Sequence, residues 1–368
     1  MIRLEIRNDG YCLGMNHFSL LLLAPALLAF QAHAVDLQNS TEIEISKTWS
    51  QEPGGWAYPM SIYVPDGEPP EGGYPVCILL HGNGGQGQGM INQFRNKIDD
   101  HALVAPSGYA NSWNICGENS DAPDVEMINE LIEQLQEFDN VNADAIRILG
   151  FSNGSALANS VFIQNQNPGL DTVCGVVSQL SDTQYHDGAF HQPSGATQQS
   201  LPFCGYDEEV GPSGICRYLG ITNSNDPVIP YQGGWSPVGV AFIDSQIAAW
   251  VMASSQGYTG KPITGDGTPI GDEVYEYAYL GNQVVHIRGN ASHGMNTRQE
   301  EYLLDFLSEW PIVISDCFSD LNGDGMVDGG DIGLMVAAWD TDAYDLNGDG
   351  TTDGGDLGLL LLDWGTCE

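Results

Sequence analysis

The chain has 368 residues, of which 49 are Asp or Glu and only 10 are Lys or Arg, so its formal net charge is −39. A surface so poor in cations argues against nucleic acids and anionic membranes as partners, and it suits the binding of divalent cations. General adaptation to salt would give the same composition, and the charge alone does not distinguish the two explanations.

The N-terminal segment has the pattern of a secretory signal peptide. Residues 18–30 form an apolar run too short to cross a bilayer comfortably, and the small residues before position 35 suit a cleavage site. We therefore expect a signal peptide over residues 1–34, a secreted mature chain without a transmembrane segment, and an extracellular location, either free or attached to a cell surface. An uncleaved anchor is the alternative, and Met15 is an alternative start.

The cysteines of the mature chain suggest two disulfide bridges, because export permits disulfides. Cys204 and Cys216 flank a short glycine-rich loop, and Cys317 and Cys367 flank the C-terminal segment, so we expect these two pairings. Cys77 lies in an apolar strand pattern, where we expect a buried free thiol.

Short strands alternate with helices from residue 41 to residue 309. We expect strands at 41–49, 56–65, 74–82, 101–107, 145–149, 171–180, 216–224 and 283–289, and helices at 91–98, 124–138, 243–255 and 298–309. This alternation predicts a mostly parallel sheet covered by helices on both faces.

The segment 145–160 has the order of a nucleophile elbow: a β-branched strand, a tight turn and a helix. The turn reads Gly-Phe-Ser-Asn-Gly around Ser152, and this arrangement would lift the serine hydroxyl out of the sheet. The amides at the start of the helix would then face an oxyanion.

Two further residues complete a predicted triad. Asp226 follows the strand at 216–224, and His293 follows the strand at 283–289, so both are expected at the carboxyl edge of the sheet with Ser152. The chain order Ser, Asp, His is that of the α/β-hydrolases. Backbone amides of Asn153 and of Asn83 or Gly84, in the glycine-rich turn after His81, are the expected oxyanion donors.

These motifs together resemble the secreted α/β-hydrolases related to polyhydroxybutyrate depolymerases and feruloyl esterases. The resemblance covers about residues 45–312 and is carried by ILLHGNGG (78–85), SWNIC (112–116), GFSNGSALA (150–158), NDPVIPYQGG (225–234) and ASHG (291–294). It implies an α/β-hydrolase domain at 35–315, a Ser152, Asp226 and His293 triad, and hydrolysis of polyester or of aromatic and acetyl esters on polysaccharide. The turn at Asn83 and the segment 181–215 depart from the family, which leaves the substrate open.

A repeat follows from residue 316 onward. Residues 320–339 and 345–364 are identical at 13 of 20 positions, and each copy has oxygen ligands at the spacing of a calcium loop. The expected ligands of two calcium ions are Asp320, Asn322, Asp324, Met326, Asp328 and Asp331 in the first loop, and Asp345, Asn347, Asp349, Thr351, Asp353 and Asp356 in the second.

One helix follows each predicted loop and none precedes it, a pattern that resembles dockerin repeats more than sensor EF-hands. The resemblance implies a small all-α module at 316–368 and a cohesin-like partner on a scaffold or cell surface. Glycines at 329, 330, 354 and 355 replace the side chains with which well-known dockerins recognise their partners, so a surface-attachment or intramolecular role is also open.

The sequence therefore predicts a secreted serine carboxylic ester hydrolase that acts on feruloyl or acetyl esters of a polysaccharide and is tethered by a calcium-binding module. Catalysis itself would need no cofactor. A polyhydroxybutyrate or other polyester depolymerase is the first alternative, and a peptidase of the same fold is another. A non-catalytic assembly or adhesion protein is an alternative from a different class.

Overall fold

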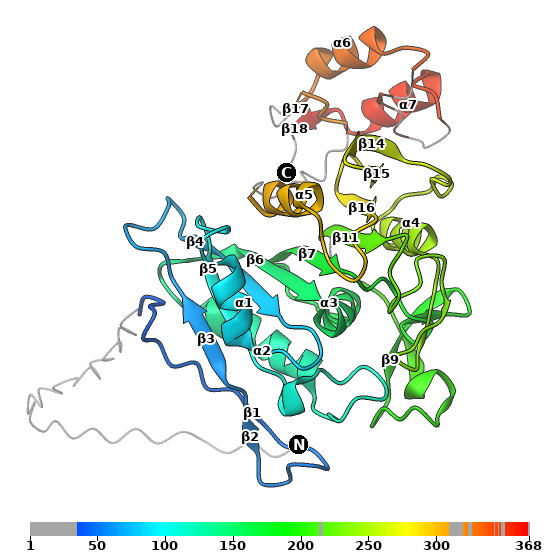
Figure 1. The fold of residues 1–368 in the computed structure, drawn as a ribbon. Helices are drawn as coiled ribbons and strands as arrows, with labels where there is room; N and C mark the ends of the chain where they lie inside the picture. Colours follow the sequence, from blue (N-terminus) through cyan, green and yellow to red (C-terminus); the bar gives the residue numbers. More distant parts are fainter. Residues whose placement is uncertain are drawn as a thin grey trace, which may run out of the picture. The chain divides into compact units, whose positions relative to one another are not determined.

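Residues 35–308 fold around a large twisted sheet (Figure 1). The computed structural model describes residues 35–212, 216–308, 319–322, 326–341, 343–344, 346 and 350–366. The strands of the sheet are β3 (Met60–Tyr63), β4 (Tyr74–Leu80), β5 (Ala102–Pro106), β6 (Val141–Phe151), β7 (Leu170–Val176), β11 (Arg217–Asn223), β14 (Thr268–Gly271), β15 (Val274–Tyr279) and β16 (Val284–Gly289). Their order in space is β14-β15-β16-β11-β7-β6-β4-β5-β3.

The strands from β16 to β5 in this order run parallel. At one edge β3 pairs antiparallel with β5, and at the other edge β15 and β14 add an antiparallel hairpin. A parallel strand in such a sheet is buried on both faces, which explains why all seven residues of β4 are apolar or aromatic and buried.

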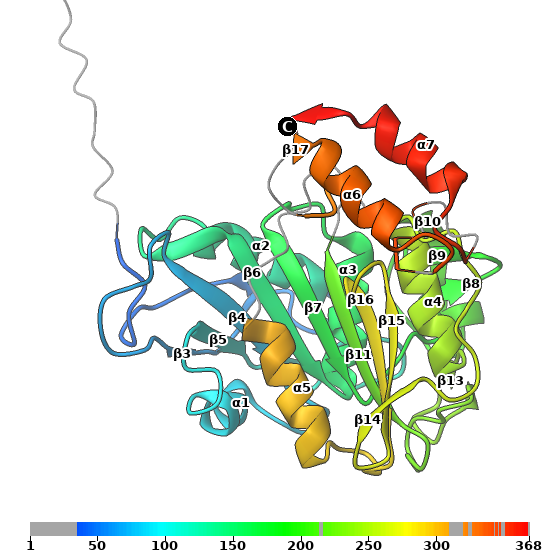
Figure 2. The same cartoon turned by 90° about the horizontal axis from the view of Figure 1, so that it is seen from above.

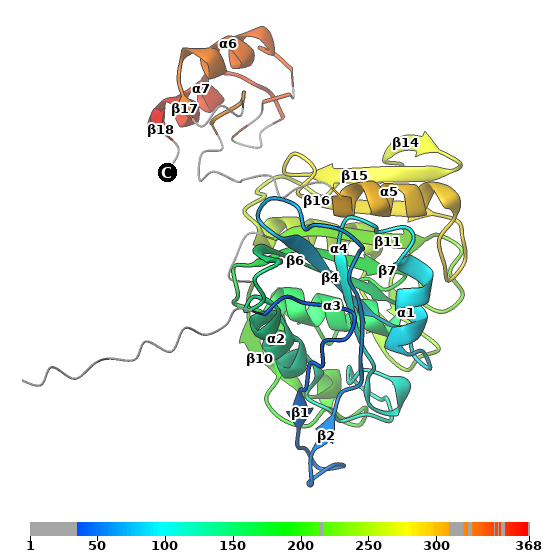
Figure 3. The ribbon, with the colours of Figure 1, turned by 90° about the vertical axis from the view of Figure 1, so that its left-hand side faces the viewer.

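Helices cover both faces of the sheet (Figure 2, Figure 3). They are α1 (Gly87–Phe94), α2 (Asp124–Leu135), α3 (Asn153–Gln164), α4 (Ser245–Ser255) and α5 (Thr297–Ser308). Along β4, Ile78 and Leu80 join the core beneath α2, α3 and α4, whereas Cys77 and Leu79 join the core beneath α1 and α5. Successive side chains of a strand point to opposite faces of the sheet, so alternate residues of β4 pack into two separate cores.

The parallel centre, the antiparallel β3 and the helices on both faces define an α/β-hydrolase fold, as the sequence predicts. No helix in the described part of the chain is long and apolar enough to cross a membrane.

Several elements differ from the sequence prediction. The strand expected at 41–49 is a strand only at β1 (Ser46–Lys47), which pairs with β2 (Trp56–Ala57), because Ile43 and Ile45 pack into the core instead of extending a sheet. Helix α1 begins four residues earlier than expected. It starts at Gly87, where a Cβ atom would lie 2.1 Å from the carbonyl oxygen of Ala105.

The segment after residue 180 contains more regular structure than its loop-like sequence indicates. The strands β8 (Tyr185–His186), β9 (Ala189–Pro193) and β10 (Tyr206–Val210) form a small antiparallel sheet, and the 3-10 helix η2 (Pro202–Gly205) precedes the last of them. Another 3-10 helix, η1 (Tyr109–Asn111), and a short hairpin of β12 (Gly234–Trp235) and β13 (Ala241–Phe242) complete the domain.

Two buried arginines anchor the helix that follows His293. Arg147 pairs with Asp171 at 3.3 Å and donates to the carbonyl oxygen of Leu307, and Arg217 donates to the carbonyl oxygen of Phe306 at 3.0 Å. Both carbonyls lie in the last turn of α5, where a helix leaves such groups unpaired and where a cation is favourable.

The described part of the C-terminal module repeats one local structure. Helices α6 (Gly329–Ala337) and α7 (Gly354–Leu362) follow the two predicted loops, and β17 (Met326–Val327) pairs with β18 (Gly365–Thr366). Asp328 and Asp353 cap the helices through side-chain bonds of 2.7 Å from the amides of Gly330 and Gly355. The expected domain boundary at 315 lies outside the described residues.

Candidate active site

Ser152 lies in a strained turn between β6 and α3. Its backbone has φ 53° and ψ −115°, a conformation that is unfavourable for any residue other than glycine. The neighbouring glycines are required by close packing: a Cβ atom at Gly150 would lie 2.2 Å from the carbonyl oxygen of Gly154, and one at Gly154 would lie 2.3 Å from that of Leu80. The strain is therefore on the serine itself, while the glycines let strand and helix approach each other.

A chain of hydrogen bonds joins the three residues of the predicted triad. The Ser152 Oγ and the His293 Nε2 are 2.8 Å apart, and the His293 Nδ1 and the Asp226 Oδ2 are also 2.8 Å apart. With a proton on Nδ1 donated to the carboxylate, Nε2 accepts from the serine hydroxyl. The other oxygen of Asp226 accepts from the amides of Val228 and Ile229, at 2.7 and 3.1 Å, which fixes the carboxylate in this orientation.

Two asparagines that the sequence analysis did not identify hold the Asp226 and His293 loops together. The buried Asn223, at the end of β11, donates to the carbonyl oxygens of Ser292 and Gly294, both at 2.8 Å. Asn225 accepts from the amide of Ser292 at 2.9 Å. These bonds hold the residues on both sides of His293. The polar run Asn-Ser-Asn at the end of the strand is the sequence signal that could have indicated the two asparagines.

The two oxyanion donors expected on the glycine-rich turn, the amides of Asn83 and Gly84, have different surroundings. The amide of Gly84 donates to the carbonyl oxygen of Asn111 at 2.7 Å, which favours Asn83 over Gly84 as the donor on this turn. Asn83 lines the same pocket as Ser152 and Asn153. The amide of Asn153, the first residue of α3, lies where the serine turn requires a donor.

His81 has a structural function in this turn. Its Nε2 accepts from the amide of Gly108 at 3.0 Å, and its Nδ1 is 2.8 Å from the carbonyl oxygen of Gly82, so the neutral ring carries its proton on Nδ1. Burial lowers the pKa of His81 and favours this neutral form. The fully buried Trp113 donates to the carbonyl oxygen of His81 at 2.7 Å and packs against its ring.

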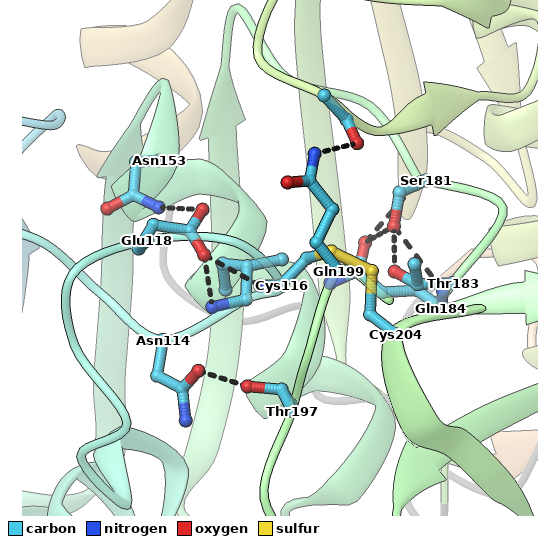
Figure 4. Close-up of a disulfide and its surroundings, with 12 residues drawn as sticks. Asn114, Cys116, Glu118, Asn153, Ser181, Thr183, Gln184, Thr197, Gln199 and Cys204 are labelled. Carbon is cyan, nitrogen blue, oxygen red and sulfur yellow. Dashed lines mark hydrogen bonds between the residues drawn. A yellow bond between two sulfur atoms is a disulfide. The ribbon is translucent and has the colours of Figure 1, made fainter. Parts of the chain in front are cut away.

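A disulfide joins Cys116 to Cys204 (Figure 4), and the neighbours of Cys116, Ile115 and Gly117, line the pocket that contains Ser152. The expected Cys204–Cys216 bridge is wrong, because Cys204 is bonded to Cys116, and Cys216, just before β11, is a free thiol buried in the core of the domain. Cys77 is a buried free thiol, as predicted. The expected bridge between Cys317 and Cys367 lies outside the described residues.

Glu118 connects the segment of Cys116 to the start of α3 (Figure 4). One carboxylate oxygen accepts from the amides of Ile115 and Cys116, at 3.1 and 2.6 Å, and the other accepts from the Asn153 Nδ2 at 3.2 Å. The Asn153 Oδ1 in turn accepts from the amide of Trp113 at 2.7 Å. This network holds the helix residue whose amide is the expected oxyanion donor.

The pocket at Ser152 has a volume of about 290 Å³. Its apolar lining residues are Ile115, Ala156, Ile229, Val238, Val240 and Phe242, and its polar ones include Asn83, Glu118, Asn119, Asn153, Ser178 and Ser181. A cavity of this size, lined by apolar and polar groups together, has room for a small organic group and polar atoms to orient it.

None of the described residues of the C-terminal module forms a group of three or more acidic, histidine or cysteine side chains placed to hold a metal ion. Of the expected calcium ligands, Asp324, Asp345, Asn347 and Asp349 lie outside the described residues. The described ligand Asp331 is buried and accepts from the amides of Leu321, Asn322 and Asp328 at 2.8, 3.1 and 2.8 Å. The Asp331 carboxylate thus binds three backbone amides of the first loop and fixes their positions relative to α6.

Solved structures offer only distant comparisons. No protein-family model matches the chain, and no curated protein matches it. The acetyl xylan esterase of Aspergillus awamori is 13% identical over 68% of this chain and 94% of that chain, with a TM-score of 0.47. A carboxylesterase of Bacillus cereus is 14% identical over 68% and 93%, with a TM-score of 0.40.

One buried acid beside the pocket wall should give the stability a characteristic pH dependence. Asp124, the first residue of α2, accepts from the Tyr58 hydroxyl at 2.9 Å and from the amide of Asn114 at 2.7 Å. Burial raises the pKa of Asp124 to about 7, against the opposing effect of these two bonds. In the unfolded chain the same carboxyl titrates near pH ~3.9.

Because the folded chain holds this proton more tightly than the unfolded chain, the stability it contributes is complete below about pH 4 and is lost as the pH rises to about 7. Asp124→Asn cannot ionise. Between pH 4 and pH 7 we therefore expect the thermal midpoint of the wild type to fall relative to that of the variant. Above pH 7 the difference between the two midpoints should stay constant. The exposed Asp144→Asn is the control, and a difference for Asp124→Asn that stays constant with pH would refute the assignment.

Proposed function

We propose that this protein is a serine hydrolase that cleaves carboxylic esters, with Ser152 as nucleophile. The observation that carries the proposal is the continuous chain of hydrogen bonds from the Ser152 Oγ through His293 to Asp226, at a strained elbow that opens into a pocket. Such an arrangement has the parts that acyl transfer requires: a nucleophile, a base in contact with it, and a carboxylate that orients the base.

In the proposed reaction the Ser152 Oγ attacks the ester carbonyl carbon while its proton passes to the His293 Nε2. Asp226 stabilises the resulting imidazolium, and the amides of Asn153 and Asn83 donate to the oxyanion. The tetrahedral intermediate collapses as His293 returns the proton to the leaving alcohol. A water molecule then attacks the acyl-enzyme with His293 again as the base, which releases the acid and restores the serine.

We further infer that the ester is feruloyl or acetyl on a polysaccharide. The support is the resemblance of the site motifs to feruloyl-esterase-like hydrolases and the small, partly polar pocket, whose carboxylate and amide groups suit a substrate with hydroxyls. A polyester depolymerase and a non-catalytic assembly protein are the competing functions, and the hydrolysis test below distinguishes all three.

We expect the wild type to hydrolyse feruloylated or acetylated xylan, and Ser152→Ala to lose at least about 10³-fold in kcat, because the substitution removes the nucleophile. Both chains are assayed against feruloylated xylan, acetylated xylan and polyhydroxybutyrate. Ser194→Ala, which alters an exposed serine, is the control and should keep its activity. Hydrolysis of polyhydroxybutyrate alone would select the polyester alternative, while activity that survives in Ser152→Ala, or no turnover on any ester, would refute the triad.

We also propose that residues 316–368 bind two calcium ions and tether the enzyme. The segment has 13 acidic residues and no Lys or Arg, and the carboxylates of Asp331 and Asp356 are buried within it. Burying such groups is costly without an opposing charge, and calcium prefers oxygen ligands of this type. The bound ions would hold the loops together through these carboxylates and their repeat partners.

A protein partner for this module is supported by its exposed apolar side chains. Val336 and Trp339 on the first repeat correspond to Leu361 and Trp364 on the second, and all four are exposed. We propose a cohesin-like scaffold or cell-surface protein as the partner. We also propose an extracellular location, which the Cys116–Cys204 disulfide supports because such bonds persist in oxidising compartments.

Calcium titration of the chelator-treated full chain should give about two bound ions per chain. Asp331→Ala should bind one ion, because it removes one carboxylate of the first loop, and Asp340→Ala, outside both loops, should bind two. Without calcium, limited proteolysis should cut within 316–368 and leave the catalytic domain intact. Absence of calcium uptake, or uptake unaffected by Asp331→Ala, would contradict the assignment.

A further inference from the structure

Most of the exposed large apolar side chains of the catalytic domain lie on two short segments, one of which lines the Ser152 pocket. Among the described residues from 35 to 308, the exposed large hydrophobic residues are Val35, at the beginning of this range, and four others on two short segments. The four are Leu201, Phe203, Trp235 and Val238, and we call them the apolar collar. Exposed apolar groups that are scattered need no explanation, but a group that borders a pocket indicates a binding surface.

The collar is attached to the active site by hydrogen bonds. The Ser236 Oγ donates to the carbonyl oxygen of Val228, whose amide donates to Asp226. Ser236 is fully buried, whereas the adjacent Trp235 is 72% exposed. Val238, in the same loop, lines the pocket that contains Ser152. Trp235 thus stands three residues from a pocket-lining residue, on the same short hairpin segment.

The two segments of the collar are also held to each other. The Gln199 side chain donates to the carbonyl oxygen of Gly239 at 3.1 Å, which connects the segment of Leu201 to the loop of Val238. Gly239 has φ +84°, a backbone conformation that favours glycine, and it leaves room for the Gln199 amide beside it. The disulfide to Cys116 fixes the first segment from its other side. One hydrogen bond and one disulfide therefore connect the two segments of the collar to each other and to the segment of Cys116.

The composition of the collar indicates the chemistry of its occupant. Residues 196–205 and 233–241 contain no charged side chain, although the whole chain has a net charge of −39. An anionic polymer would be repelled by the rest of the surface, and the two collar segments offer a cationic polymer no carboxylate, so we infer a neutral occupant. Apolar faces alternate here with glutamine, serine and backbone groups, and Glu118 adds a carboxylate to the pocket wall. A polyester has no hydrogen-bond donors for that carboxylate, whereas a sugar has hydroxyl groups.

We propose that the apolar collar is a subsite for a neutral polysaccharide chain, with a pyranose ring stacked on the face of Trp235. This inference rests on the proposed function, since it assigns the collar to the polymer that carries the ester. An aromatic face meets the C–H face of a sugar ring, while the hydroxyls at the ring edge find the polar groups beside it. Trp235 is then a positioning and specificity residue that acts on polymers and not on small esters.

Binding of acetylated xylan tests the collar without depending on catalysis. We expect Ser152→Ala/Trp235→Ala to bind the polymer about threefold to tenfold more weakly than Ser152→Ala in affinity electrophoresis. Trp235→Phe in the same background should recover part of the loss, and Val35→Ala, an exposed residue outside the collar, should cause none. In the otherwise wild-type chain, Trp235→Ala should raise KM for acetylated xylan while leaving kcat/KM for p-nitrophenyl acetate unchanged.

Equal binding by the chains with and without Trp235 would overturn the proposal, as would a loss of affinity confined to polyhydroxybutyrate film. Failure of the proposed function would have a different signature. In that case the wild type would not hydrolyse p-nitrophenyl acetate, while the binding comparison would still decide whether the collar holds a polysaccharide.

Discussion

The tight contact between β6 and α3 is the constraint on which the rest of the site depends. Gly150 and Gly154 have no space for a side chain, and their closeness forces Ser152 into a conformation that a serine adopts only under tertiary constraint. A strained residue persists when its surroundings fix it. Here those surroundings are a buried parallel strand, a buried helix and the turn after β4, so the stability of the domain maintains the geometry of the hydroxyl.

Because the position of the Ser152 hydroxyl is fixed, Asp226 and His293 must be held in position to meet it, and several hydrogen bonds do this. Asp226 and His293 lie on separate loops, and the bonds made by Asn223 and Asn225 turn these loops into one unit. Gln299 of α5 also donates to Asn223 at 3.0 Å, and Arg147 and Arg217 hold the last turn of that helix. The imidazole is thus positioned by groups that extend from the serine turn to the far end of α5.

The fold class and the meeting of Ser152, Asp226 and His293 could be predicted from sequence because each residue follows a strand and its turn is marked by local residue types. The Cys116–Cys204 pairing could not be predicted, since it joins residues 88 positions apart and depends on how the loops pack. Whether Gly84 has a free amide depends on the distant Asn111. The hairpin of β14 and β15 was missed, although the alternation in 274–279 could have indicated its second strand.

The central claim, an activated serine at position 152, is tested most directly by covalent labelling with a fluorophosphonate, which reacts with serines that an adjacent base activates. We expect one label per chain, located on Ser152 by mass spectrometry, and none after His293→Gln. Labelling of a different serine, or no labelling of a folded chain, would contradict it.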